Sequence, residues 1–250
     1  MLGVVNLIVL ESYEVDDAGT ARLTGARATH VVEVLKARVG QRLRIGRLNG
    51  PLGTGTVMSA DEGAVSLACQ FEAAPPPQPR VDLLLALPRP KVLRRLWSQL
   101  AAIGVGHIIL TNAARVERHY FDSHVLEVGT YAPLLIEGLQ QAQDTWLPRV
   151  SIHRRFKVLI EDDLDGLCPS GARLVAHPGE GQSIGQALGG ARDARVLLAV
   201  GPEGGWVTFE RDLLVDRGFH VVELGQRSLR SDTATIALLT LVHDALRHMG

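Results

Sequence analysis

The chain has 250 residues, 46% hydrophobic and 21% charged, a composition that predicts a soluble globular protein of one large domain or two smaller ones. The formal net charge of −1 excludes a uniformly basic surface, so any nucleic-acid site must be a local patch of arginine or lysine. Two cysteines without CxxC spacing exclude a disulfide framework and a structural zinc site, and we expect no metal and a reducing cytoplasm. No apolar run reaches the roughly 18 residues of a membrane span, and the apolar start lacks the basic lead of a signal peptide.

The first 74 residues are predicted to form a small, mostly β domain. Short runs of strand-forming residues are separated by Gly, Asn and Asp turns, with one helical stretch near residues 30–37. Such a module often docks the substrate of a larger domain, and a purely structural appendage is the alternative. The predicted strands are residues 6–10, 42–47, 55–58 and 64–68.

Residues 75–80 are predicted to be a linker, because four prolines stand within residues 75–79 and favour an extended connector. From residue 81 to residue 250, apolar strands alternate with amphipathic helices, which predicts an α/β domain with a parallel sheet. Open sheets of this class bind ligands at the carboxyl ends of their strands. The predicted strands are residues 81–87, 107–110, 173–176, 195–200 and 220–224, and the predicted helices are residues 91–102, 134–142 and 231–249.

The most informative loop follows the strand that ends at Val200, where the sequence reads VGPEGGWVT. Gly201, Gly204 and Gly205 leave room for a ligand to approach the backbone, and a helix capped by Thr208 is expected to follow. The loop lacks both the Gly-Lys-Ser/Thr ending of a phosphate-binding loop and a GxGxxG pattern. Hydrolysis of a nucleotide triphosphate and a Rossmann-type nucleotide enzyme are therefore disfavoured, although a tight connector without function remains an alternative.

A second loop, LGQRSLRSDTA over residues 224–234, follows the next strand and precedes a long amphipathic helix that we expect to begin with Ser231 as its N-cap. GPEGG followed by LGxRxLRSDTA resembles the signature pair of the 16S ribosomal RNA uridine-N3 methyltransferases, a SPOUT family. A third segment, RLVAHP over residues 173–178, is similar to the same family, so the match covers most of residues 172–240.

The resemblance implies a SPOUT trefoil-knot methyltransferase domain with an N-terminal PUA-like β-barrel that helps to hold RNA. It implies S-adenosyl-L-methionine (SAM) as cofactor, ribosomal RNA or the small ribosomal subunit as partner, and pairing into a homodimer through the knot and the last helix. That helix also has apolar residues on more than one side, including Leu238 and Leu241, which a single core-facing stripe would not need and which favours a homodimer. The family's cofactor contacts carry over to Ala176, His177, Val200, Gly201, Gly204, Gly205, Leu224, Gly225, Ser228 and Leu229.

Transfer of a methyl group to N3 of uridine requires removal of a proton, and a nearby cation favours the anionic base. Arg230 is the first candidate for that cation. Glu203 and Asp232 are candidate proton acceptors, although carboxylates also occur at helix N-termini for reasons unrelated to catalysis. The candidate contacts to RNA phosphate are Arg94, Arg95, Arg118, Arg154 and Arg227, with ordinary surface charge as the alternative.

The middle of the chain departs from the family. Gln99 and Ala102 stand where the family has polar Lys and Glu, and Asp144 replaces an Arg. Two alternatives therefore stay open: a SPOUT methyltransferase acting on another RNA position, and a catalytically silent RNA-binding or ribosome-assembly factor.

Overall fold

The structure is a computed structural model that describes residues 7–61, 63–169, 171–179, 181–189, 195–225, 227 and 229–248. The chain groups into two compact units. The first contains residues 1–78 and 136–147, and the second contains residues 79–135 and 148–250.

The first unit is built on a five-stranded sheet with the order β1-β3-β4-β5-β2. β1 is parallel to β3 and the other pairs are antiparallel. Alternate residues of the strands, among them Leu23, Ile45 and Leu67, are buried in one apolar core. The elements are β1 (Ile8–Leu10), η1 (Ser12–Glu14), β2 (Thr20–Thr24), α1 (Gly25–Thr29), the π-helical turn η2 (His30–Val34), β3 (Arg42–Arg47), β4 (Leu52–Asp61) and β5 (Ala64–Phe71).

The predicted helix near residues 30–37 is shifted in the structure. Helical backbone begins at Gly25 and ends at Val34, because Ala28 and Val31 supply its buried side. β2 was not predicted, although Ala21 and Leu23 alternate with exposed residues as in a half-buried strand.

Residues 136–147 come from the middle of the chain and belong to the first unit. The Leu7 N–H donates to the Gln140 carbonyl at 3.3 Å, and the Asn49 N–H donates to the Thr145 carbonyl at 2.8 Å. The buried Thr145 hydroxyl donates to the Gly50 carbonyl at 2.6 Å, and Trp146 Nε1 donates to the Pro76 carbonyl at 2.7 Å. The boundary predicted at the proline linker omits this segment, since nothing in its helical pattern indicates which unit it joins.

The second unit is built on a sheet of six parallel strands in the order β11-β9-β10-β6-β7-β8. β10 lies between β6 and β9, and β11 forms the edge of the sheet next to β9. The order of these strands in the sheet therefore differs from their order in the chain. The strands are β6 (Val81–Ala86), β7 (Val105–Thr111), β8 (Arg149–His153), β9 (Ala172–Ala176), β10 (Val196–Val200) and β11 (Phe219–Val222). β8 was not predicted, because its residues show no run of buried side chains.

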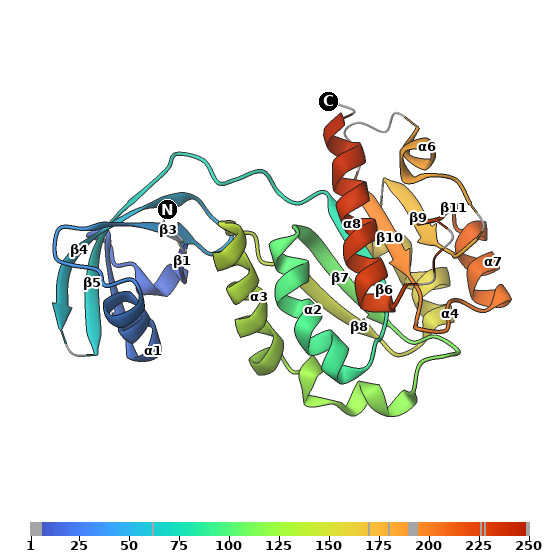
Figure 1. The fold of residues 1–250 in the computed structure, drawn as a ribbon, viewed down its shortest axis with the longest axis horizontal. Helices are drawn as coiled ribbons and strands as arrows, with labels where there is room; N and C mark the ends of the chain where they lie inside the picture. Colours follow the sequence, from blue (N-terminus) through green and yellow to red (C-terminus); the bar gives the residue numbers. More distant parts are fainter. Residues whose placement is uncertain are drawn as a thin grey trace. The chain divides into compact units, whose positions relative to one another are not determined.

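Helices cover this sheet (Figure 1). α8 packs on β6, β10, α2 and α6, while α7 packs on β9 and β11. Among the described residues, no helix is long and apolar enough to cross a membrane. The helices are α2 (Pro90–Ala102), η3 (Arg118–Asp122), η4 (His124–Leu126), α3 (Val128–Ala142), α4 (Phe156–Val158), η5 (Leu159–Asp163), α5 (Leu164–Leu167), α6 (Ile184–Leu188), α7 (Thr208–Asp216) and α8 (Ser231–His248).

Two predicted helix caps are wrong. Thr208 is the first residue of α7, and the cap position is Val207, whose N–H donates to the Glu210 carboxylate at 3.0 Å. Ser231 is likewise the first residue of α8 and not the residue before it. The predicted last helical residue, Met249, lies outside the described residues.

Candidate functional site

The carboxyl ends of β9, β10 and β11 lie side by side, and the loops that follow them line a cavity. Three chain segments far apart in sequence meet here, as the loop pattern predicts. The lining residues are Ala176, His177, Pro178, Val200, Gly201, Pro202, Glu203, Gly205, Val222, Leu224, Gly225, Arg227, Leu229, Ser231, Ala234 and Leu238.

Glycine is required at several positions of these loops. Gly205 and Gly225 have φ of 73° and 95°, which side chains with a Cβ rarely adopt. Gly201 is needed for space: a Cβ there would lie 3.1 Å from the Trp206 backbone nitrogen and 3.2 Å from its indole nitrogen. The Trp206 side chain is buried and packs on Phe156. A larger residue at position 201 would therefore push against a fixed indole ring or into the cavity.

The cavity offers both flat apolar surface and free backbone donors. Val222, Leu224 and Leu238 supply apolar side chains. In the part of the chain that the structure describes, no hydrogen bond uses the backbone N–H of Leu224, Gly225 or Leu229. These two features suit a flat heteroaromatic ring, whose faces need apolar contact and whose edges need hydrogen bonds.

Predicted residues of the glycine-rich loop have different surroundings. Glu203 lines the cavity and forms an ion pair with Arg89 at 3.2 Å. Gly204 does not line the cavity; its carbonyl accepts a hydrogen bond from the Arg115 guanidinium, and a Cβ at position 204 would meet the Arg115 side chain. Sequence reasoning missed Arg89, which lies in the loop after β6 without any distinctive local motif.

A buried carboxylate, also missed, connects two loops beside the cavity. Glu210 is 4% exposed, and its two oxygens accept the N–H groups of Ala114 at 2.6 Å and Val207 at 3.0 Å. It therefore joins the loop after β7 to the start of α7. A sequence signal for this role was available: Glu210 is the third residue of the helix that follows the glycine-rich loop, a position where Glu often caps the helix start.

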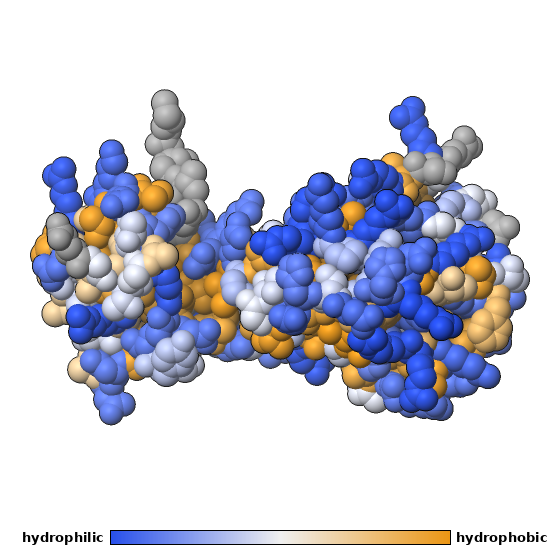
Figure 2. Space-filling model, turned by 90° about the horizontal axis from the view of Figure 1, so that it is seen from below, coloured by the Kyte–Doolittle hydropathy of each residue, from blue (hydrophilic) through white to orange (hydrophobic). Residues whose placement is uncertain are grey.

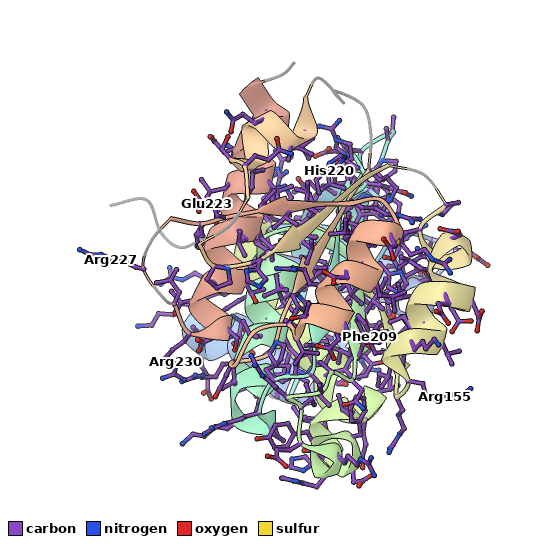
Figure 3. All side chains as sticks on the ribbon, turned by 90° about the vertical axis from the view of Figure 1, so that its right-hand side faces the viewer. Arg155, Phe209, His220, Glu223, Arg227 and Arg230 are labelled. Carbon is purple, nitrogen blue, oxygen red and sulfur yellow. The ribbon has the colours of Figure 1, made fainter. Side chains whose placement is uncertain are left out.

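Arg230 and Asp232 lie in a neighbouring hollow and not in the cavity lining. Asp232 forms an ion pair with Arg95 at 3.1 Å, and Arg230 Nε lies 3.6 Å from the same carboxylate. Gln99, one of the departures from the family, lines this hollow too. The Arg230 side chain is 70% exposed, and Figure 3 shows Arg227 and Arg230 extending from the segment before α8.

The remaining predicted RNA contacts are spread over the second unit. Arg94 and Arg118 are exposed. Arg154 forms an ion pair with Asp122 at 3.1 Å and packs over the Phe121 ring, so part of its charge is already compensated. On the face drawn in Figure 2, hydrophilic residues cover much of this unit and hydrophobic ones are interspersed among them. Ser228, a predicted cofactor contact, lies outside the described residues.

A second polar cluster lies at the amino ends of β6 and β7. The buried Asp82 carboxylate pairs with Arg195 at 2.6 Å. Burial lowers the pKa of His107 to about 4, and burial with the nearby Asp82 charge raises the pKa of Cys168 to about 11. A thiol with so high a pKa is a poor nucleophile.

Comparison with known proteins places this geometry in a family. The model of the RNA methyltransferase domain matches residues 75–243, which is most of the chain. The chain belongs to this family of RNA methyltransferases. A relative from Treponema pallidum, named ribosomal RNA small subunit methyltransferase E, is 28% identical over 95% of this chain and 90% of its own length. A relative from Borreliella burgdorferi, ribosomal RNA small subunit methyltransferase E 1, is 24% identical over 91% of this chain and 93% of its own length.

Solved structures share the fold of this RNA methyltransferase. A probable rRNA methyltransferase from Porphyromonas gingivalis superposes with a TM-score of 0.76 at 19% identity, covering 98% of this chain and all of that one. The ribosomal RNA small subunit methyltransferase E from Neisseria gonorrhoeae, solved with S-adenosyl methionine, superposes with a TM-score of 0.75 at 18% identity, covering 96% of this chain and 97% of that one. The predicted α/β methyltransferase fold is thereby confirmed.

Proposed function

We propose that this methyltransferase transfers a methyl group from SAM to N3 of a uridine in 16S ribosomal RNA. The observation that carries the proposal is the cavity at three adjacent parallel strand ends, whose lining contains the matched loop segments. The names of the relatives, each a small-subunit ribosomal RNA methyltransferase, support the choice of substrate.

The residues of the cavity fit an adenosyl group. Leu224, Gly225 and Leu229 would present backbone N–H groups to the adenine edge, while Val222 and Leu238 would contact its faces. Gly201 would allow the ligand to lie against the end of β10. When bound, SAM supplies an electrophilic methyl group on a sulfonium. The protein's task is therefore to place a nitrogen nucleophile in line with it and to exclude water.

Glu203 is the proposed acceptor of the uridine N3 proton, because it lines the cavity whereas Asp232 lies in the neighbouring hollow. The Arg89 guanidinium lies 3.2 Å from the Glu203 carboxylate and would help to orient it. Arg230 and Arg227 are proposed to stabilise the anionic base and the adjoining phosphate through their charge. Both extend from the segment before α8 (Figure 3), and the Arg230 side chain is 70% exposed.

The finer features of the family are also part of the proposal. The first unit is proposed to be the PUA-like barrel that holds RNA. A trefoil knot of the segments around β9, β10 and β11 is proposed from the resemblance of the loops that follow these strands. A homodimer through α8 is proposed because Leu241 is exposed. Leu238 was also expected at the dimer surface, but it is buried and lines the cavity, so it does not support a dimer. Its ribosomal RNA substrate would place the protein in the cytoplasm.

Calorimetry with SAM tests the cofactor site. The wild-type protein should bind SAM saturably, and Gly201→Val should weaken binding at least about tenfold by filling the cavity. Leu229→Glu, at a 42% exposed lining position where folding is little affected, should do the same. Gly129→Val is the matched control, because a Cβ at Gly129 meets nothing within 4 Å. Absence of SAM binding, or equal binding by all variants, would refute the site.

Transfer of the labelled methyl group of SAM to small-subunit ribosomal RNA separates the enzyme from a silent RNA-binding factor. The enzyme should produce 3-methyluridine, and Glu203→Gln should lower kcat about a hundredfold while SAM binding is kept. A protein that binds SAM and RNA without transferring the methyl group would be the silent factor.

A further inference from the structure

A second cavity, of about 490 Å³, lies within the first unit. It is bordered by β1, by the helical segment of α1 and η2, and by the last turns of α3. Arg27, His30, Glu137, Gln140 and Gln141 line it with polar groups, while the side chains of β1 and Val31 supply apolar surface. The methyl-transfer cavity shares none of these residues.

The walls of this cavity are fixed to one another. The Leu7 N–H donates to the Gln140 carbonyl, which joins β1 to α3. Arg27 donates to the Val9 carbonyl at 2.6 Å and pairs with Glu14 at 2.5 Å, which joins the helical segment to β1. The space between the walls is therefore a built feature of the unit.

The helical wall contains a π turn. The Leu35 N–H donates to the His30 carbonyl at 3.0 Å, five residues back, and His30 is the first residue of that turn. π turns are rare and occur frequently at functional sites, because the extra residue changes the direction of a side chain. Here the first residue of the turn is His30, whose imidazole lines the cavity.

The polar groups of the lining are free to bind a ligand. Among the described residues, no hydrogen bond or ion pair uses the side chains of His30, Glu137, Gln140 or Gln141. Arg27 is different, because its charge is already compensated by Glu14. The cavity thus has a free carboxylate and no free guanidinium, which disfavours a phosphate and favours a neutral ligand with N–H donors.

We propose that this cavity binds an unstacked guanine of the RNA substrate, with Glu137 accepting hydrogen bonds from N1–H and N2–H. The proposal rests on the proposed function, since it takes the ligand to be part of that RNA. Guanine alone among the four bases presents two adjacent N–H donors on its Watson–Crick edge, and a carboxylate accepts both. The amides of Gln140 and Gln141 and the His30 ring then provide donors for its O6 and N7 acceptors.

Nuclear magnetic resonance of the isotope-labelled full chain tests the proposal, with guanosine, adenosine, cytidine and uridine monophosphates as probes. Guanosine monophosphate should shift the amide signals of residues 26–31 and 137–141 saturably, about tenfold more tightly than the other three. Glu137→Gln should weaken that binding about tenfold, because an amide oxygen cannot replace both carboxylate contacts. Glu33→Gln is the control: Glu33 is exposed in the same π turn and does not line the cavity.

In methyl transfer to small-subunit RNA, Glu137→Gln should raise KM about tenfold with kcat unchanged, whereas Glu33→Gln should change neither. Equal response to all four nucleotides, shifts confined to other residues, or no saturation at millimolar nucleotide would overturn the proposal. The nucleotide titration needs neither SAM nor methyl transfer. Failure of the guanine cavity therefore remains distinguishable from failure of the methyltransferase assignment.

Discussion

At the scale of single residues, His107 couples stability to pH. Its ring nitrogen lies 2.9 Å from the Ser151 hydroxyl, and burial lowers its pKa from 6.5 to about 4, so the folded protein holds the ring neutral. The unfolded chain binds a proton more readily below pH 6.5. His107 therefore destabilises the fold as pH falls from 6.5 toward 4, by about 2 kcal/mol at pH 4.5.

The variant His107→Gln, which keeps a polar partner for Ser151 without titrating, should lose less stability over this range. Urea unfolding at pH 7 and pH 4.5 measures the effect. The wild type should lose about 2 kcal/mol more than the variant between the two pH values. Equal losses would show that His107 is not held neutral.

Individual site residues were predictable only where a motif marked them. Gly201, Leu224 and Gly225 stand in matched loops after apolar strands, and all line the cavity. Arg89 carries no local signal of its position, since its partner Glu203 is more than a hundred residues away in sequence. Asp144, which replaces a family Arg, accepts the N–H groups of Thr145 and Trp146 in the turn that follows α3.

At the scale of elements, the Glu210 side chain links α7 to the loop after β7. Its buried carboxylate satisfies two backbone N–H groups from different elements. Glu210→Gln retains one acceptor and leaves the other N–H unpaired, so we expect a loss of about 1–3 kcal/mol in the free energy of unfolding. The loop carrying Arg115 should also lose its fixed position beside Gly204.

Urea unfolding measures this loss, and Asp212→Asn on the same helix is the control, because Asp212 pairs only with the adjacent Arg211 at the surface among the described residues. The control should change stability by less than about 0.5 kcal/mol. If Glu210→Gln behaves like the control, the carboxylate does not join these elements.

Elements with strong patterns were predictable and weakly patterned ones were not. β6 and β10 are fully buried and, apart from Asp82 in β6, apolar, which is the pattern of central parallel strands. β8 is an edge strand with mixed exposure, so its sequence resembles a loop. The π turn at His30–Val34 has no known sequence pattern, and only the backbone geometry reveals it.

At the scale of the whole molecule, the order of strands brings the chemistry together. The sheet order β11-β9-β10 places three loop segments side by side, although β9 and β11 are separated in the chain by β10 and α7. Periodicity predicts a parallel sheet but leaves strand order undetermined. The resemblance to a known family predicted that these loop segments share one cofactor site, but it gave no strand order. Neither periodicity nor resemblance assigned residues 136–147 to the first unit.

The most direct test of the account is mass spectrometry of nucleosides from the 16S ribosomal RNA of cells that lack this gene. The account predicts that 3-methyluridine is missing there, returns with the wild-type gene, and does not return with Gly201→Val. An unchanged content of 3-methyluridine in the deletion strain, or full restoration by Gly201→Val, would contradict it.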